Sequence, residues 1–319
     1  MTYRTIFGPI PSRRFGTSLG IDLSPGKKQC NYDCLYCELA AAKPVETIEN
    51  PPAVDEVISE LKAALKEHPD IDVITLTANG EPTLYPFLDE LIERIDTIKN
   101  GYKTLILTNA STIADPKVQQ ALAKLDTVKL SLDCVTPECF RKLDRPVRTV
   151  DVGTIVEGIR TFRRRYKGEM ILEILMVRGI NDTDKEIDAF NRILPTLGAD
   201  RIDLGTVDRP PAYPVEPLSY DELLALAQKK FDPSLPIHIA SRRTPDAARG
   251  HYDESEILAT LAKRPLTMED IRSLFDTPTL RRFDQLLSQG KIQKKEVGTL
   301  TFYGTAFALQ KSGKSRQNS

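Results

Sequence analysis

Apolar residues in the first two thirds of the chain follow two alternating spacings. Short, almost wholly apolar runs such as DVITL (residues 72–76) are typical of strands buried on both faces of a sheet. Longer segments such as AVDEVISELKAALKEH (residues 53–68) have apolar residues three or four positions apart, which indicates amphipathic helices. The pattern predicts six strands, at residues 15–23, 72–82, 103–110, 127–133, 169–182 and 199–211. It predicts five helices between them, at residues 53–68, 86–101, 116–125, 151–166 and 183–197.

This alternation of strands and helices predicts the fold class. Each helix would connect two parallel strands through a right-handed crossover, which gives an α/β fold. Six units are fewer than the eight of a closed barrel, so we expect a partial, open (β/α)6 TIM-like barrel. In such folds the functional loops follow the carboxyl ends of the strands.

The pattern changes after the proline-rich stretch DRPPAYPVEP, at residues 208–217. One helix and one strand are predicted in a linking region that reaches residue 250. Three short helices and a hairpin turning at Gly298–Thr299 follow, an order typical of a winged helix-turn-helix domain. We therefore predict a core at residues 1–215, a linking region at residues 216–250, and a winged-helix domain with a basic tail at residues 251–319.

Charge does not favour a nucleic-acid partner for the chain as a whole, because 44 basic and 45 acidic residues almost cancel. Residues 254–319 carry 11 lysines and arginines against 7 acidic residues. RNA or DNA contact through the winged helix and a protein-contact or lid role therefore both stay open. No run approaches about 18 apolar residues and no secretory signal opens the chain, so we expect a cytoplasmic protein with no membrane partner.

Three of the five cysteines lie within eight residues, in the segment CNYDCLYC at residues 30–37. An odd number of cysteines in a chain of this length does not suggest a disulfide framework, so we expect free thiols that can bind metal. Structural zinc sites use four protein ligands, and a [4Fe–4S] cluster normally takes four cysteine thiolates. Three thiolates would leave one iron with an open position for a small molecule.

The spacing C-x3-C-x2-C, with Tyr36 before the last cysteine, resembles the signature of the radical S-adenosylmethionine (SAM) superfamily. The resemblance implies that Cys30, Cys34 and Cys37 bind three irons of a [4Fe–4S] cluster and that SAM chelates the fourth. It also implies reductive cleavage of SAM to a 5′-deoxyadenosyl radical, which abstracts hydrogen from a substrate. An electron donor such as flavodoxin or ferredoxin is then an expected partner.

Further positions resemble the superfamily at the ends of predicted strands. Residues 79–82, NGEP, resemble its GGEP motif, which implies that Asn79, Gly80 and Glu81 hold the methionine part of SAM. The same resemblance implies that four more polar residues meet the ribose hydroxyls or the carboxylate; alternatively, these residues cap the helices that follow. They are Thr108, Asn109, Ser131 and Asp133.

Residues 5–215 resemble the iron–sulfur oxidoreductases related to the enzyme that makes the tricyclic core of wyosine in tRNA. The matching segments are FGPIPSRRFGTSLGIDLSP, CNYDCLYCEL, NGEPTL and TVDRPP. No cysteine precedes Cys30, so the second cluster of that enzyme and its pyruvate-condensing activity are not expected here. The predicted function is a radical SAM enzyme whose substrate the sequence does not identify, with RNA or tRNA modification as one class.

Two other functions stay open. A glycyl-radical activating enzyme, which acts on a partner protein, would share the cysteine triplet and the glutamate loop. A redox-sensing DNA-binding regulator would use the winged helix, but it leaves the barrel motifs without a role.

Several residues have two interpretations each. Cys134 and Cys139 either pack as small apolar residues or, for Cys134 beside the strand end, take part in hydrogen-atom transfer or metal binding. Glu173 lies either inside the barrel with an ion-pair partner or on a solvated face, and the same holds for Arg178. Arg13 and Arg14 either hold an anionic substrate or form surface ion pairs.

Overall fold

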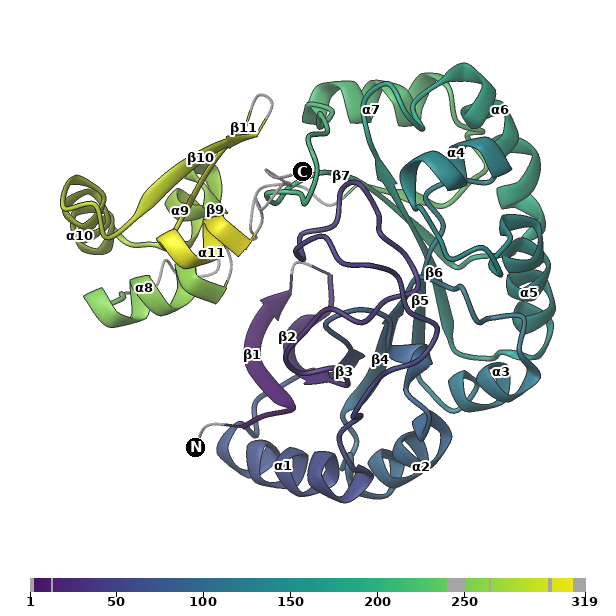
Figure 1. The fold of residues 1–319 in the computed structure, drawn as a ribbon, viewed down its shortest axis with the longest axis horizontal. Helices are drawn as coiled ribbons and strands as arrows, with labels where there is room; N and C mark the ends of the chain where they lie inside the picture. Colours follow the sequence, from purple (N-terminus) through teal and green to yellow (C-terminus); the bar gives the residue numbers. More distant parts are fainter. Residues whose placement is uncertain (1–2, 13, 240–250, 264, 298–299, 312–319) are drawn as a thin grey trace.

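The computed structural model describes residues 3–12, 14–239, 251–263, 265–297 and 300–311. Its main feature is an open sheet in which the strands follow one another in chain order (Figure 1). Strands β2 to β8 are parallel, and β1 pairs antiparallel with β2. The strands are β1 Ile6–Ser12, β2 Gly16–Asp22, β3 Val73–Thr77, β4 Lys103–Thr108, β5 Thr127–Ser131, β6 Glu169–Met176, β7 Arg201–Thr206 and β8 Ile237–His238.

All six strands predicted for the barrel are present, as β2 to β7, and they are parallel as expected. The fold is therefore an α/β fold with the parallel-rich sheet of a partial TIM barrel. Strand β1 was not predicted, because Gly8, Pro9 and Pro11 interrupt its sequence. Proline cannot donate to a sheet ladder and is tolerated at an edge. Strand β1 lies at the edge of the sheet, where β2 is its neighbour among the described strands.

Helices cover the outer face of this sheet (Figure 1). The five predicted helices are confirmed, and short helix α4 is an additional one that the apolar pattern did not predict. The helices are α1 Val54–Glu67, α2 Leu88–Ile98, α3 Pro116–Leu122, α4 Pro137–Leu143, α5 Val152–Arg165, α6 Asp184–Ile193 and α7 Tyr220–Lys229, with 3₁₀ turns at Pro82–Leu84 and Leu194–Thr196.

Strand register assigns the side chains of the sheet to two faces. Val128, Leu172 and Ile202 belong to the apolar core shared with the helices. Their neighbours alternate to the inner face of the barrel, where Glu173 of β6 is in register with Asp203 of β7. The inner face is thus more polar than the outer one.

The predicted linking region contains α7 and β8, and β8 pairs with β7. Five of its side chains, Leu218, Leu223, Leu226, Phe231 and Leu235, are buried in the same core as the barrel strands. Residues 216–239 are therefore continuous with the barrel sheet. The division of the chain at residue 215 stays a prediction.

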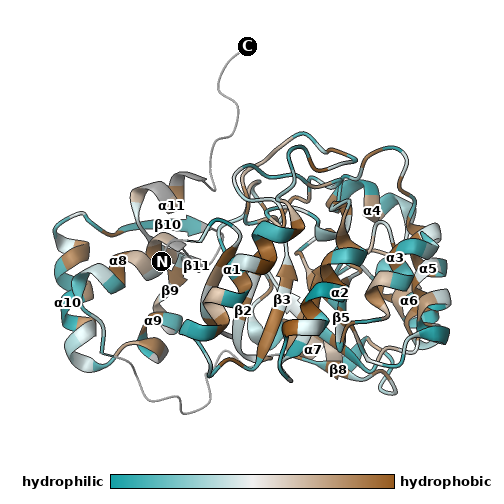
Figure 2. Ribbon diagram, turned by 90° about the horizontal axis from the view of Figure 1, so that it is seen from below, coloured by the Kyte–Doolittle hydropathy of each residue, from teal (hydrophilic) through white to brown (hydrophobic). Residues whose placement is uncertain are grey.

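A second hydrophobic core lies in the C-terminal part of the chain. The elements around it are α8 Glu254–Lys263, β9 Leu266–Thr267, α9 Met268–Leu274, α10 Thr277–Ser288, β10 Gln293–Val297, β11 Leu300–Gly304 and α11 Ala306–Lys311. The strands form a small sheet in the order β10-β11-β9. This C-terminal module lies beside the barrel in both views (Figures 1 and 2), and its buried residues, such as Ile271, Phe283 and Phe302, are separate from the barrel core.

The three predicted helices and the two hairpin strands of the C-terminal module are present. The predicted turn at Gly298–Thr299 lies outside the described residues, as does the tail at residues 312–319. Among the described residues, every helix is too short or too polar to cross a membrane.

Candidate functional site

The cysteine triplet lies on the long loop between β2 and α1. The thiols of Cys30, Cys34 and Cys37 are all free. The backbone of this loop is held against the segment that follows α4, since Leu35 N donates to Leu143 O at 2.9 Å and Asp33 N donates to Asp144 O at 3.2 Å. The triplet therefore sits on a loop whose conformation is fixed by backbone hydrogen bonds.

Burial raises the pKa of all three thiols, that of Cys30 to about 12. At neutral pH each of them is a neutral thiol unless positive charge is supplied. One cation is close. Burial alone would lower the pKa of the Lys28 ammonium, but the facing Cys37, Cys30 and Cys34 raise it overall. One ammonium cannot balance three thiolates, so full deprotonation calls for additional positive charge, which a bound metal supplies.

The predicted loop at residues 79–81 lies directly beside the residue before the triplet. Gln29 N donates to Asn79 O at 2.9 Å, and Glu81 N donates to Gln29 O at 3.0 Å. Gly80, between them, has a φ of +148°, and a Cβ built there would lie 1.7 Å from the Gln29 carbonyl oxygen. Glycine is required at this position because the two backbones touch. The side chain of Asn79 donates to Gly26 O at 3.0 Å.

Glu81 is buried and accepts hydrogen bonds from neighbouring strand ends. Thr108 Oγ1 donates to its Oε1 at 2.6 Å, and Asn109 N donates to its Oε2 at 2.7 Å. Thr83 donates to Oε1 through both its backbone N and its hydroxyl. Burial raises the pKa of Glu81, and these hydrogen bonds offset part of that effect. The structure thus brings Glu81, Thr108 and Asn109 together, with their polar atoms directed largely at one another.

Asn109 also reaches the triplet, because its Nδ2 lies 3.5 Å from Cys30 Sγ and 2.9 Å from Asn31 Oδ1. The predicted strand-end residues therefore connect to the cysteines through one side chain.

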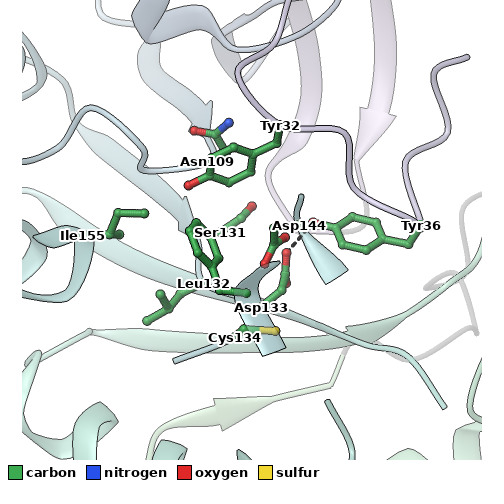
Figure 3. A pocket seen from close by; sticks show the side chains of 10 residues that line it. Tyr32, Tyr36, Asn109, Ser131, Leu132, Asp133, Cys134, Asp144 and Ile155 are labelled. Atoms are coloured by element: carbon green, nitrogen blue, oxygen red, sulfur yellow. Dashed lines mark hydrogen bonds between the residues drawn. The ribbon is translucent and has the colours of Figure 1, made fainter. Parts of the chain in front are cut away.

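Ser131 and Asp133 line a small cavity, which Tyr32 and Tyr36 of the cysteine loop also line (Figure 3). Tyr36 Oη donates to Asp133 Oδ2, and Leu175 N donates to Asp133 Oδ1 at 2.6 Å. Burial raises the pKa of Asp133 to about 7. The cavity is about 50 Å³, which is room for a few water molecules. Its lining residues are Tyr32, Tyr36, Asn109, Ser131, Leu132, Asp133, Cys134, Phe140, Asp144 and Ile155.

Cys134 and Cys139 form a disulfide, so the expectation of free thiols is wrong for this pair. Cys134 follows the end of β5, and Cys139 lies in the first turn of α4, which places their Cα atoms 5.6 Å apart. The prediction was based on the odd number of cysteines, and it did not include α4, the helix that brings Cys139 close to Cys134. Glu186 lies beside the pair but accepts hydrogen bonds from Val135 N and Thr136 N, which satisfy its carboxylate.

The inner face of the barrel carries a network of ion pairs. Lys129 Nζ lies 2.6 Å from Glu173 Oε1 and 3.2 Å from Asp203 Oδ2. Arg14 lies within 3.4 Å of the same two carboxylates. Glu173 therefore lies inside the barrel with ion-pair partners, which confirms the first of the two interpretations given from the sequence. Arg178 instead forms a surface ion pair with Glu222, at 2.6 Å, and Arg13 lies outside the described residues.

Four buried polar atoms near the triplet make no hydrogen bond to any described residue. They are Lys28 Nζ, Tyr32 Oη, Asp33 Oδ1 and Asp144 Oδ2. Buried polar atoms without partners are rare in native proteins and are commonly explained by a bound ion or ligand. Together with three free thiols on one loop, these atoms fit a bound metal group that brings positive charge and hydrogen-bonding atoms.

Sequence reasoning missed several residues of this site. Lys28 and Asp144 carry no motif, and only the fold places Asp144 Oδ1 3.6 Å from Cys34 Sγ. The role of the segment TVDRPP was also not predicted. The chain just after it covers the cysteine loop, since Ala212 N donates to Cys37 O at 2.7 Å and Tyr213 Oη donates to Asp33 Oδ2 at 2.6 Å. The two prolines of this segment, which follow the apolar strand β7, could have indicated an extended loop there.

Comparison with known proteins identifies related sequences and folds. The radical SAM superfamily matches residues 27–190. A UPF0026 protein of Helicobacter pylori is 43% identical over 300 residues, which cover 93% of this chain and 96% of that protein. A UPF0026 protein of Methanocaldococcus jannaschii is 29% identical over 308 residues, which cover 93% and 94%. The structure of TYW1 with a lysine–pyruvate adduct is 21% identical and has a TM-score of 0.51, covering 66% of this chain and 72% of that one, which is a likeness of fold.

Proposed function

The chain belongs to the radical SAM superfamily and to the UPF0026 proteins, and we propose that it is an enzyme that cleaves SAM reductively and directs the resulting radical to a substrate. Proteins of this superfamily bind a [4Fe–4S] cluster and SAM. When bound, the two supply the reductive cleavage of the SAM sulfonium to methionine and a 5′-deoxyadenosyl radical.

One observation carries the proposal: three free thiols lie on one fixed loop, and the backbone of Asn79–Glu81 is hydrogen-bonded to Gln29, next to the first of them. In the proposed enzyme Cys30, Cys34 and Cys37 would hold the cluster, at which SAM would bind. Residues of the neighbouring strand ends bind and orient SAM. These are Asn79, Gly80, Glu81, Thr108, Asn109, Ser131 and Asp133.

The chain's own residues then have distinct tasks. Glu81 holds the ends of β3 and β4 together through Thr108 and Asn109, which fixes the floor of the SAM site. Tyr36 and Asp133 tie the cysteine loop to β5. The ion pairs of the inner barrel face balance the charges of Lys129, Glu173 and Asp203 within the barrel.

The C-terminal module is proposed to be a winged helix. Helices α8, α9 and α10 together with the three-stranded sheet support this assignment. RNA contact through α10, an electron donor of the flavodoxin or ferredoxin type, and a cytoplasmic location are the other elements of the proposal that come from the sequence.

The test is anaerobic reconstitution of the full chain with iron and sulfide. About four of each per chain are expected, and after reduction with dithionite the loaded protein should release 5′-deoxyadenosine from SAM. Cys30→Ala, Cys34→Ala and Cys37→Ala should each lose the cluster. The matched control, Cys134→Ser with Cys139→Ser, should keep its iron. Iron uptake that does not depend on the triplet contradicts the cluster site, and a loaded protein that releases no 5′-deoxyadenosine contradicts the proposed activity.

A further inference from the structure

Two adjacent lysines before the cysteine triplet have opposite environments. The side chain of Lys27 is 67% exposed and pairs with Glu49 at 2.5 Å. The side chain of Lys28 is 6% exposed. An ammonium is strongly hydrated, so burying it carries a large desolvation cost unless a partner replaces the water.

Lys28 has no such partner among the described residues. Its Nζ makes no hydrogen bond to an oxygen or nitrogen of the described residues, and the nearest carboxylate oxygen, Asp33 Oδ1, is 3.9 Å away. Asp33 is already engaged through its other oxygen, which accepts from Tyr213 Oη at 2.6 Å and lies 3.3 Å from Arg145 Nη2. Asp33 therefore does not account for the burial of Lys28.

The buried Nζ of Lys28 instead lies against the cysteine loop, because Asp33, 3.9 Å from it, stands between Cys30 and Cys34. Among the cysteine thiols, that of Cys37 has the strongest influence on the Lys28 ammonium. Three thiolates outweigh the charge of an oxidised [4Fe–4S] core, so the assembled site is anionic and becomes more so on reduction. A fixed cation in a buried site stabilises such charge strongly, because little water screens it. Hydrogen bonds to the sulfurs of a cluster are also known to set its reduction potential.

We propose that Lys28 is a positioning residue that donates its ammonium N–H to a sulfur of the bound cluster or of Cys37. Its charge makes the reduced state of the cluster easier to reach. The proposal deepens the proposed function and rests on the cluster site, not on the cleavage of SAM. It assigns Lys28 a role that no sequence motif indicates.

The experiment compares Lys28→Met with Lys27→Met. Methionine keeps an unbranched side chain and removes the charge and the donors. Each full-length variant is reconstituted anaerobically without SAM, and the midpoint potential of the cluster is measured by EPR-monitored redox titration. We expect a clear negative shift for Lys28→Met and none for Lys27→Met, because the exposed charge is screened by solvent and salt.

The outcomes separate the two proposals. If the unsubstituted chain takes up no cluster, the proposed function fails and Lys28 loses its role with it. If the cluster is bound and its midpoint potential is the same in Lys28→Met as in Lys27→Met, only the proposed role of Lys28 is overturned. If Lys28→Met does not hold a cluster, Lys28→Arg decides: iron retained by the arginine variant supports a required cation, and iron lost from both variants overturns the proposal.

Discussion

At the scale of single residues, the site depends on glycine at position 80, because there is no room for a Cβ there. An alanine there would place its Cβ 1.7 Å from the Gln29 carbonyl oxygen, in addition to the unfavourable φ of +148°. Gly26, on the cysteine loop, also has a positive φ, of +114°, but no atom lies within 4 Å of a Cβ built there. The two glycines differ mainly in the backbone collision.

We expect Gly80→Ala to lower iron uptake severely, because Gln29 and with it Cys30 must move away. Gly26→Ala should cost only the backbone strain, of the order of 1–3 kcal/mol, and should take up iron like the unsubstituted chain. Iron content after reconstitution and thermal unfolding of the apoprotein measure the two effects. Equal iron content in both variants would show that the Gln29–Gly80 contact does not support the cysteine loop.

Residues with a motif were predictable, and residues placed only by the fold were not. The triplet and the strand-end residues Glu81, Thr108 and Asn109 were named from sequence, and the structure brings them together. Their hydrogen bonding to one another was not foreseen, since strand ends far apart in the chain meet only once the sheet has formed. Lys28 was missed because nothing in KKQC distinguishes a buried lysine from an exposed one.

At the scale of elements, α4 couples the disulfide to the cysteine loop. Its first turn carries Cys139, bonded to Cys134 at the end of β5. Its last residue, Leu143, accepts from Leu35 N, and the residue after it, Asp144, accepts from Asp33 N. The disulfide therefore constrains one end of the helix whose other end holds the loop with the triplet.

We predict that the denatured, unreduced apoprotein has three thiols that react with a thiol reagent, and five after reduction. Replacing both cysteines, Cys134→Ser with Cys139→Ser, should lower the free energy of unfolding by about 2 kcal/mol, as expected for the closure of a short loop. The double variant should be insensitive to added reductant. Five reactive thiols before reduction would contradict the disulfide.

Helices and strands could be predicted from the sequence where their buried residues form a clear apolar pattern. Strands β3 to β7 are covered by helices on one face and read as apolar runs, and α1, α2, α5 and α6 show helical spacing. The pattern fails for β1, an edge strand interrupted by prolines, and for the seven-residue α4, which is too short to show a period. The two-residue β9 and the six-residue α11 of the C-terminal module were not predicted either, because they are equally short.

At the scale of the whole molecule, the two separate hydrophobic cores indicate which residues form the domain that contains the site. Among the described residues, the barrel core contains none from the C-terminal module, and its buried members extend to Leu235, beyond the predicted boundary at residue 215. Ending the chain at residue 215 removes five buried side chains from this core, namely Leu218, Leu223, Leu226, Phe231 and Leu235. Their burial contributes on the order of 10 kcal/mol, comparable with the roughly 5–15 kcal/mol that stabilises a typical domain.

Two truncated chains follow from this argument. Residues 1–239 should fold cooperatively and take up as much iron as the full chain, because every residue of the proposed site and its supporting core is kept. Residues 1–215 should fail to fold, since they lack α7 and β8. Circular dichroism during thermal unfolding and iron content after reconstitution distinguish the cases. If residues 1–215 fold and bind iron, the domain boundary lies at residue 215, as predicted from the sequence. If residues 1–239 do not fold, the barrel needs the C-terminal module for its stability.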